Sequence, residues 1–174
     1  MRVVRYETLE QVQSLRPLLE AYIRFVVADL DRYAGVSFSA DELIENTMSD
    51  LSKVLPPKGW TFAAENDDGE AIGMVFLRKS TDAAMEIKRL FVTPSARGTG
   101  AGHALLESSI EQSKKAGSNY LRLDTSANLE TAIALYERRG FRHRPPYEES
   151  DHFNDPVLAP HLVFMELDLS EESR

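Results

Sequence analysis

Three glycines at alternate positions, Gly98, Gly100 and Gly102, follow a strand-like run that ends at Val92 and open a helical pattern. Glycine adopts left-handed backbone conformations at little cost, so successive N–H groups of such a turn can point to one place. The first N–H groups of the helix and its dipole add partial positive charge there, and Arg97 adds a full one. This segment therefore predicts a turn that holds a phosphate or a similar anion.

The residues after the glycines exclude two common phosphate sites. A Walker loop needs Lys and then Ser or Thr after its last glycine, but His103 and Ala104 stand there. The dinucleotide fingerprint needs a glycine where this chain has His103 or Leu105. The pattern instead suits a pyrophosphate held by main-chain amides and one arginine without a metal. The alternative is a glycine-rich turn that binds no ligand.

The rest of the chain alternates between helical and strand-like patterns. Helices are expected over 8–30, 39–54, 100–116 and 128–139, and strands over 60–65, 71–78, 85–92, 120–124, 141–144 and 162–169. Pro17 either kinks the first helix or lies in its first turn. This order predicts an α/β chain with a mixed sheet, helices on both faces and a single domain over residues 1–174.

Composition narrows the function further. The chain has 20 basic and 28 acidic side chains, a net charge of −8 that repels nucleic acid and anionic membranes and attracts amines. It has no cysteine, and its four histidines lack ligand spacing, so no metal site is expected. No apolar run approaches the ~20 residues that span a bilayer. With no apolar segment typical of a signal peptide near the N-terminus, a cytoplasmic protein is expected.

Three segments in order carry a family resemblance. Residues 97–102 fit the pattern Arg/Gln-x-x-Gly-x-Gly/Ala, residues 86–92 resemble the strand before it, and residues 132–141 resemble Ala-x-x-Leu-Tyr-x-x-x-Gly-Phe. The chain thus resembles the GNAT superfamily of acetyl-CoA-dependent N-acetyltransferases, in particular small bacterial members whose acceptors are undefined. The resemblance implies a GNAT-like fold with a central, mostly antiparallel mixed sheet and a splayed strand pair.

The resemblance also supplies acetyl-CoA as the co-substrate. The alternation of the strand slips at Lys88 and Arg89, as a β-bulge would cause. In the family, the pantetheine arm lies beside such a bulge, and a backbone N–H polarises the thioester carbonyl, a role that falls here to the Leu90 or Phe91 region. The residues expected to bind the coenzyme are Leu90, Phe91, Val92, Arg97, Gly98, Thr99, Gly100, Ala101, Gly102, Ala132 and Tyr136.

One position departs from the family pattern. Many relatives carry an asparagine seven residues before the motif tyrosine, where it contacts the pantetheine arm, but this chain has Leu129 there. Asn128 lies one residue earlier and is expected to be the N-cap of its helix. The pantetheine contact is therefore not transferred to either residue.

Acetyl transfer to an amine needs a deprotonated nucleophile, an oxyanion donor and an acid for the leaving thiolate. Tyr136 is the candidate acid, and the alternative is a core tyrosine that packs through its ring. Glu86 is the candidate base, directly or through water, and the alternative is a strand residue that faces solvent. Glu65 is a weaker candidate base.

The predicted activity is N-acetylation of a primary amine on a small molecule or amino-acid-like acceptor. Two alternatives stay open: a catalytically silent acyl-CoA-binding regulatory module, and an acetyltransferase for protein lysines or N-termini. Arg89 is a candidate to face an acceptor carboxylate, and Asp124 and Thr125 are candidates to line the acceptor site. The loop over 147–160 is either a lid, a dimer contact or neither. A monomer or homodimer is expected.

Overall fold

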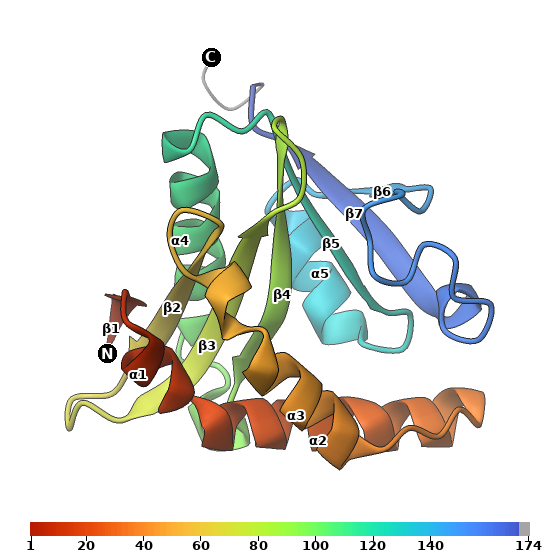
Figure 1. Ribbon diagram of the computed structural model, residues 1–174, viewed down its shortest axis with the longest axis horizontal. Coiled ribbons are helices and arrows are strands. Elements are labelled where there is room, and N and C mark those ends of the chain that lie inside the picture. The colour runs from red at the N-terminus through yellow and green to blue at the C-terminus, as the bar shows by residue number, and fades with distance from the viewer. Residues whose placement is uncertain (171–174) are drawn as a thin grey trace.

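The computed structural model describes residues 1–170 (Figure 1). Its elements are β1 (Arg2–Tyr6), α1 (Leu9–Gln13), α2 (Arg16–Ala34), α3 (Ala40–Ser49), η1 (Leu51–Val54), β2 (Gly59–Glu65), β3 (Ala71–Lys79), β4 (Ala84–Val92), η2 (Pro94–Ala96), α4 (Ala101–Lys115), β5 (Tyr120–Ser126), α5 (Glu130–Arg138), β6 (Arg142–Arg144), η3 (Ala159–His161) and β7 (Leu162–Asp168). The mixed α/β class predicted from the sequence is confirmed.

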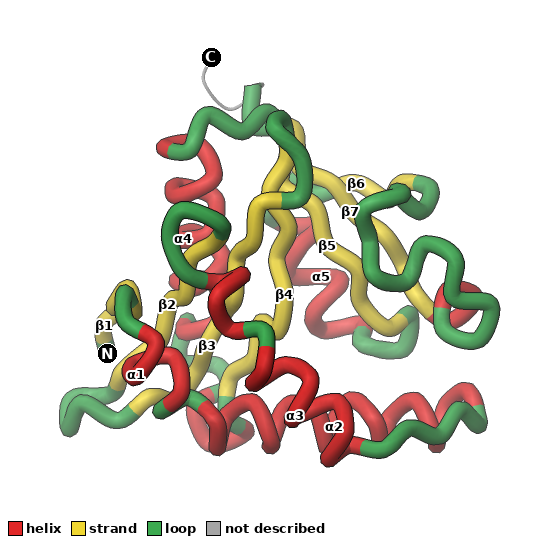
Figure 2. The backbone as a smooth tube through the Cα atoms, in the orientation of Figure 1, coloured by secondary structure: helices red, strands yellow, loops and turns green. Residues whose placement is uncertain are grey.

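The strands of residues 1–170 form one seven-stranded sheet in the order β1-β2-β3-β4-β5-β7-β6. Every neighbouring pair is antiparallel except β4 and β5, which are parallel. The parallel pair requires a crossover, and α4 provides it. Figure 2 shows the strands in yellow, with β4 and β5 close together at one end and far apart at the other.

Helices cover both faces of the sheet, as expected. On one face, α4 and α5 bury apolar side chains in a core that includes Leu105, Leu106 and Tyr136. On the other face, α1, α2 and α3 form a second core with the opposite sides of β2, β3 and β4, and Leu19 and Ile44 are buried there. Both faces of β2 and β3 are therefore largely withdrawn from water, which explains why most of their residues are apolar.

The N-terminal region differs from the prediction in two ways. Residues Arg2–Tyr6 form an edge strand that pairs antiparallel with β2, an element that the sequence analysis missed. The predicted first helix is two helices. Thr8 caps α1 in a capping box with Gln11, as predicted, and Pro17 lies in the first turn of α2, one of the two placements expected for it. A proline is tolerated there because the N–H it lacks has no helical partner.

Candidate active site

The glycine-rich turn between β4 and α4 has the backbone geometry that its sequence predicts. Gly98 and Gly100 have φ of +80° and +88°, in the left-handed region that favours glycine, and α4 starts directly after at Ala101. Within residues 1–170, the backbone N–H groups of Gly98, Gly100, Ala101 and Gly102 have no hydrogen-bond acceptor. A short stretch of chain thus presents four free donors beside the positive end of a helix dipole.

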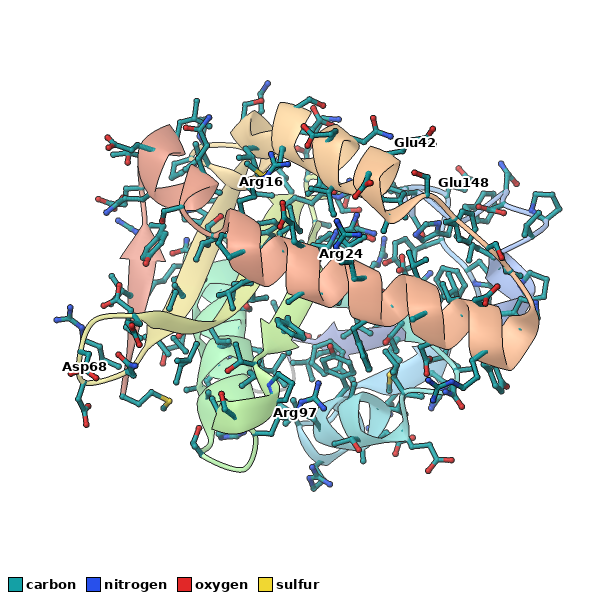
Figure 3. The ribbon with its side chains drawn as sticks, turned by 90° about the horizontal axis from the view of Figure 1, so that it is seen from below. Arg16, Arg24, Glu42, Asp68, Arg97 and Glu148 are labelled. Atoms are coloured by element: carbon teal, nitrogen blue, oxygen red, sulfur yellow. The ribbon has the colours of Figure 1, made fainter. Side chains whose placement is uncertain are left out.

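Two side chains of this turn take different positions. Arg97 lies between the start of α4 and α5 (Figure 3), with its guanidinium 5.6 Å from the centre of the Phe25 ring. Thr99 closes the turn, because both its N–H and its hydroxyl donate to the carbonyl of Ala96, at 3.4 and 2.7 Å. Thr99 therefore shapes the turn, and its N–H is directed away from the row of free donors.

The expected bulge is present in β4. Met74 of β3 lies opposite Phe91, but Phe76 lies opposite Lys88, so one residue of β3 faces two residues of β4. Arg89 sits in this bulge with φ of +56°, the only positive φ outside glycine in residues 1–170. A left-handed arginine is strained by roughly 1–2 kcal/mol, and such strain persists where the surrounding structure fixes it. The β-bulge predicted from the slip in alternation at Lys88 and Arg89 is therefore confirmed.

The strands β4 and β5 separate after Glu86, just before the bulge. The two strands pair only from Ala84 to Glu86 on β4 and from Tyr120 to Arg122 on β5. Their later residues diverge, and α5 lies beside the opening (Figure 1). Leu90 and Val92 pack on the face that carries α4, whereas Phe91 packs on the opposite face, where its ring meets that of Tyr22 at 5.9 Å. The predicted splayed strand pair is confirmed, with the glycine-rich turn at its open end.

Tyr136 lies on α5 beside this opening. Its side chain is buried, and its ring packs against Phe141 at 5.7 Å, so it is part of the core. Burial raises the pKa of the phenol above its usual value, and Tyr22 and Asp124 nearby raise it further. The phenol therefore stays protonated at neutral pH. Ala132, one turn earlier on α5, packs against the same core.

The helix start predicted at Asn128 is wrong. The N-cap of α5 is Leu129, which makes no side-chain capping hydrogen bond. Asn128 instead uses its amide nitrogen to donate to both carboxylate oxygens of Asp29 on α2, at 3.0 and 3.1 Å. The side chain of Asn128 therefore makes a tertiary contact with α2 and does not form the helix cap that its local propensity had predicted.

Glu86 does not face solvent, so that alternative is wrong. Its side chain is 0% exposed and lies in a group of charges between β3, β4 and β5. Arg78 binds one carboxylate oxygen at 2.7 Å, whereas Lys88 at 3.0 Å and the hydroxyl of Tyr147 at 2.8 Å bind the other. Both oxygens are therefore occupied, and no acceptor molecule can contact them directly without displacing a partner.

Further carboxylates complete the group around the buried Glu86, which we call the buried charge cluster and define as Arg78, Glu86, Lys88, Asp124 and Asp151. Asp151 is its exposed member, and Arg78, Lys88 and Asp124 are partly buried. Lys88 lies 3.2 Å from Asp124 and 3.5 Å from Asp151, and Arg78 lies 3.0 Å from Asp151. Burial alone would lower the pKa of Lys88, but Asp124 and Glu86 outweigh it, so the pKa is raised. Burial opposes ionisation of Asp151, but Lys88 and Arg78 outweigh it and lower its pKa.

The loop between β6 and β7 is fastened to this cluster. Tyr147 is buried against Glu86, and Ser150 is buried and donates to Asp124 at 2.9 Å. Asp151 binds Arg78 and Lys88 from the same loop. The first part of the loop therefore acts as a wall of the site.

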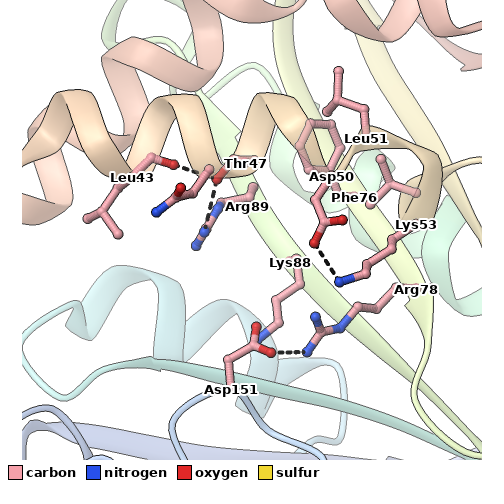
Figure 4. Close-up of a pocket in the computed structure, with 12 residues that line it drawn as sticks. Leu43, Thr47, Asp50, Leu51, Lys53, Phe76, Arg78, Lys88, Arg89 and Asp151 are labelled. Carbon is pink, nitrogen blue, oxygen red and sulfur yellow. Dashed lines mark hydrogen bonds and ion pairs between the residues drawn. The ribbon is translucent and has the colours of Figure 1, made fainter.

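A cavity of about 260 Å³ opens beside the cluster, on the face of the sheet that carries α3 (Figure 4). Its charged lining consists of Asp50, Lys53, Arg78, Lys88, Arg89 and Asp151. The bulge residue Arg89 thus reaches from the splayed strands into this cavity. Arg89, Asp124 and Thr125 were the candidates for the acceptor side. Arg89 lines the cavity, whereas Asp124 lies behind it on Lys88 and Thr125 is not part of the lining.

Several residues of this region were missed from the sequence. Arg78, Lys88 and Tyr147 bind Glu86, and Asp151 binds Arg78 and Lys88, but none of the four was singled out as a site residue. The partner Arg78 could have been predicted from the β3–β4 hairpin, because its register places Arg78 directly opposite Glu86. The other candidate base, Glu65, lies on β2 and is bound by Arg2 and Tyr6, outside this group.

Among residues 1–170, no group of three or more His, Cys, Asp or Glu side chains could hold a metal ion. None of the helices in this range is long and apolar enough to cross a membrane.

Similarity to known proteins identifies the family of this chain. Residues 23–141 match the Acetyltransferase (GNAT) family. An IAA acetyltransferase from Azospirillum brasilense is 33% identical over 132 residues, which cover 75% of this chain and 83% of that protein.

Two solved structures share the fold. A Klebsiella pneumoniae protein, proposed to be an acyl-CoA N-acyltransferase, is 26% identical with a TM-score of 0.64, and the match covers 97% of both chains. PaiA N-acetyltransferase from Thermoplasma acidophilum, solved in complex with coenzyme A, is 17% identical with a TM-score of 0.69 over 97% of this chain and 99% of that one. With the family match spanning more than half of its length, this chain belongs to the GNAT family of acetyltransferases and is an acyltransferase enzyme.

Proposed function

We propose that this enzyme transfers the acetyl group of acetyl-CoA to a primary amine of a small molecule or amino-acid-like acceptor. The observation that carries the proposal is the opening between β4 and β5, which has free backbone donors at one end and a cavity beside the bulge. A thioester arm lying in this opening would meet an acceptor held in the cavity. The cavity of about 260 Å³ favours a small acceptor over a folded protein segment.

The turn at the start of α4 would hold the diphosphate of the coenzyme. The N–H groups of Gly98, Gly100, Ala101 and Gly102 would donate to its oxygens, and Arg97 would add charge. A Cβ placed on Gly102 would meet Leu135 and Val92 at 3.7 and 3.8 Å, so α5 and β4 already lie close to this turn. The solved complex of PaiA with coenzyme A supports a coenzyme site in this fold.

The pantetheine arm would lie along β4 after the bulge. There β4 has lost its pairing with β5, so backbone groups over Leu90, Phe91 and Val92 are available on that edge. We assign the oxyanion donor to a backbone N–H at Leu90 or Phe91, because the bulge changes the direction of these groups.

The reaction balances without a covalent enzyme intermediate. The lone pair of the neutral amine attacks the thioester carbon, the C–N bond forms, and a tetrahedral oxyanion results. The oxyanion collapses, the C–S bond breaks, and the sulfur leaves with its electron pair. The sulfur gains one proton from Tyr136, and the proton that the amine loses returns to Tyr136 through water, so the products are an amide and a free thiol.

Tyr136 is proposed as the acid for the departing sulfur. Its raised pKa keeps the phenol protonated, which is the state that a donor needs. A thiol resembling Cys has a pKa of about 8.5, so full proton transfer from a phenol above 10 is uphill by at least ~2 kcal/mol. Tyr136 therefore acts first by donating a hydrogen bond to the sulfur, and its proton is replaced by the one that the amine releases.

Glu86 is proposed to act on the amine only indirectly. Because its carboxylate is fully buried and both oxygens are bound, any proton it takes must pass through water that displaces a partner. Its larger effect is to fix Arg78 and Lys88 beside the cavity. Because Glu86, Asp124 and Asp151 offset these two cations, the proton of the amine leaves through water and not by repulsion from Arg78 and Lys88.

The experiment that tests the function joins binding and turnover. We expect calorimetry to show acetyl-CoA binding to the folded protein. We also expect free thiol to appear from acetyl-CoA when amines, amino acids, polyamines or aminoglycosides are added. Mass spectrometry should find one acetyl group on the amine for each thiol released. The absence of acetyl-CoA binding would refute the coenzyme site, and binding without any amine-dependent thiol release would refute the transfer.

A further inference from the structure

We propose that the acceptor is an amine that also carries a carboxylate, and that Arg89 binds this carboxylate. This inference rests on the proposed function, because it specifies which amines the cavity accepts. The charged side chains that line the cavity support it, because Arg89 is the one basic side chain among them that has no carboxylate partner within residues 1–170.

The cavity is basic although the chain as a whole is acidic. Four basic and two acidic side chains line it, whereas the chain carries a net charge of −8. Lys53 pairs with Asp50, while Arg78 and Lys88 are bound by the carboxylates of the buried charge cluster. These three cations already have partners, so they leave little unsatisfied charge.

Arg89 is different. Within residues 1–170, no carboxylate lies within ion-pair distance of its guanidinium. Its recorded contacts are one long hydrogen bond to the hydroxyl of Thr47, at 3.4 Å, and the ring of Tyr22 at 5.8 Å. The hydroxyl of Thr47 donates in turn to the carbonyl of Leu43 at 2.8 Å, so Thr47 is held by its own helix. A half-buried guanidinium with five donors therefore keeps most of them for a ligand.

The bulge in β4 explains why the guanidinium of Arg89 lies in the cavity. Arg89 is held in a left-handed conformation that arginine disfavours, and the register shift between β3 and β4 fixes it there. The planar fork of arginine matches the two oxygens of a carboxylate, which lysine cannot do. The same bulge places Arg89 next to Leu90, one of the two candidate oxyanion donors. A carboxylate on Arg89 thus brings an amine a few bonds away toward the thioester.

The same cavity suits the amine end of such an acceptor. Arg78 and Lys88 are offset by the three carboxylates of the buried charge cluster, so the cluster does not repel an ammonium group. A carboxylate on the same molecule would pair with Arg89.

The test compares ligands that differ only in the carboxylate. Thiol release from acetyl-CoA is measured with L-amino acids, with their α-amides and with the corresponding decarboxylated amines. We expect kcat/KM to be roughly 10–100-fold higher for the best amino acids than for their amides, the range for a hydrogen-bonded charge. In Arg89→Asn, where asparagine tolerates the left-handed backbone, this preference should disappear through KM, while the KM for acetyl-CoA stays the same.

Two further variants separate charge from shape. Arg89→Lys keeps the charge without the fork and should retain only part of the preference. Arg142→Gln removes an exposed arginine from β6 and should change nothing. Equal use of amino acids and amides by the unaltered enzyme would overturn the proposal, as would a carboxylate preference that survives Arg89→Asn.

A binding measurement tests the carboxylate site independently of whether the enzyme transfers an acetyl group. With coenzyme A present, calorimetry compares N-acetyl amino acids with their N-methylamides on the unaltered enzyme and on Arg89→Asn. We expect tighter binding of the acids, lost in the variant, and equal binding would refute the carboxylate site. If no amine releases thiol, the transfer reaction is refuted, and this binding comparison alone decides whether Arg89 holds a carboxylate.

Discussion

The two ends of the opening between β4 and β5 present different chemical groups, backbone N–H groups at one end and charged side chains at the other. The glycine-rich turn presents backbone N–H groups, whose partial charges are fixed by the path of the chain. The buried charge cluster presents full charges on side chains from β3, β4, β5 and the loop after β6. The first end depends on backbone conformation, and the second depends on every charge having its partner.

This difference determines how each end responds to a mutation. Main-chain donors that face water need no counter-charge in the free enzyme, so a change there disturbs the ligand more than the fold. A buried ion, by contrast, becomes uncompensated when its partner is removed. Changes in the cluster should therefore appear in stability, and changes in the turn should appear in coenzyme binding.

The largest expected effect comes from Glu86→Gln in the cluster. Glutamine keeps the shape but leaves Arg78 and Lys88 short of one buried negative charge. The free energy of unfolding should fall by about 3–5 kcal/mol, measured by denaturant titration. Glu111→Gln, which breaks an exposed ion pair with Lys115 on α4, should cost less than about 1 kcal/mol. A similar small loss for Glu86→Gln would show that the cluster is not stabilising in the way we describe.

Tyr136→Phe removes only the phenol oxygen, which we place between the glycine-rich turn and the buried charge cluster. Turnover should fall by roughly 10²-fold or more, because the leaving sulfur loses its donor, while acetyl-CoA affinity changes little. Steady-state kinetics and calorimetry measure the two quantities. Tyr33→Phe, at an exposed position on α2, is the matched control and should leave both unchanged. Unaltered turnover in Tyr136→Phe would leave Tyr136 with a packing role alone.

Gly100→Ala tests the backbone end against a matched glycine. Gly100 and Gly69 have φ of +88° and +83°, and a Cβ would meet no atom within 4 Å at either position. Both alanine variants should therefore lose a similar stability, about 1–2 kcal/mol, from left-handed strain. Only Gly100→Ala should weaken acetyl-CoA binding, since Gly69 lies in the β2–β3 turn. Equal coenzyme affinity in the two variants would contradict the diphosphate site.

The smallest expected effect is an absence of inhibition at alkaline pH. Burial, with Tyr22 and Asp124, raises the pKa of Tyr136, and Asp124 and Glu86 raise that of Lys88. Both groups act in their protonated form, so activity should not fall until the pH exceeds their ordinary values, 10.0 and 10.5. A pH–rate profile should rise as the amine deprotonates and stay high to about pH 10. A falling limb centred near pH 8 would assign the proton donor to another group.

Short-range patterns predicted the coenzyme end well. Gly98 and Gly100 have the left-handed backbone expected of them, and the slip in alternation at Lys88 and Arg89 marked the bulge correctly. Such features succeed because a few neighbouring residues decide them, through steric limits on φ and through the period of the strand.

Predictions failed where distant contacts decide. Residues Arg2–Tyr6 are too short and too mixed to signal a strand, and they become one by pairing with β2. Asn128 left its expected cap for Asp29, which is 99 residues away in sequence. The solvent-facing alternative for Glu86 failed because Arg78, Lys88 and Tyr147 come from other positions and enclose it.

By itself, the sequence determined the family, the α/β class and the turn that faces the coenzyme, because each is written in contiguous residues whose conformation is set locally. Only the tertiary structure decided the acceptor side. There the register of β3 with β4, the divergence of β5 and the loop after β6 bring opposite charges together. Whether a charge is neutralised depends on which residues surround it in space, and among the basic side chains that line the cavity, Arg89 alone has no carboxylate partner within residues 1–170.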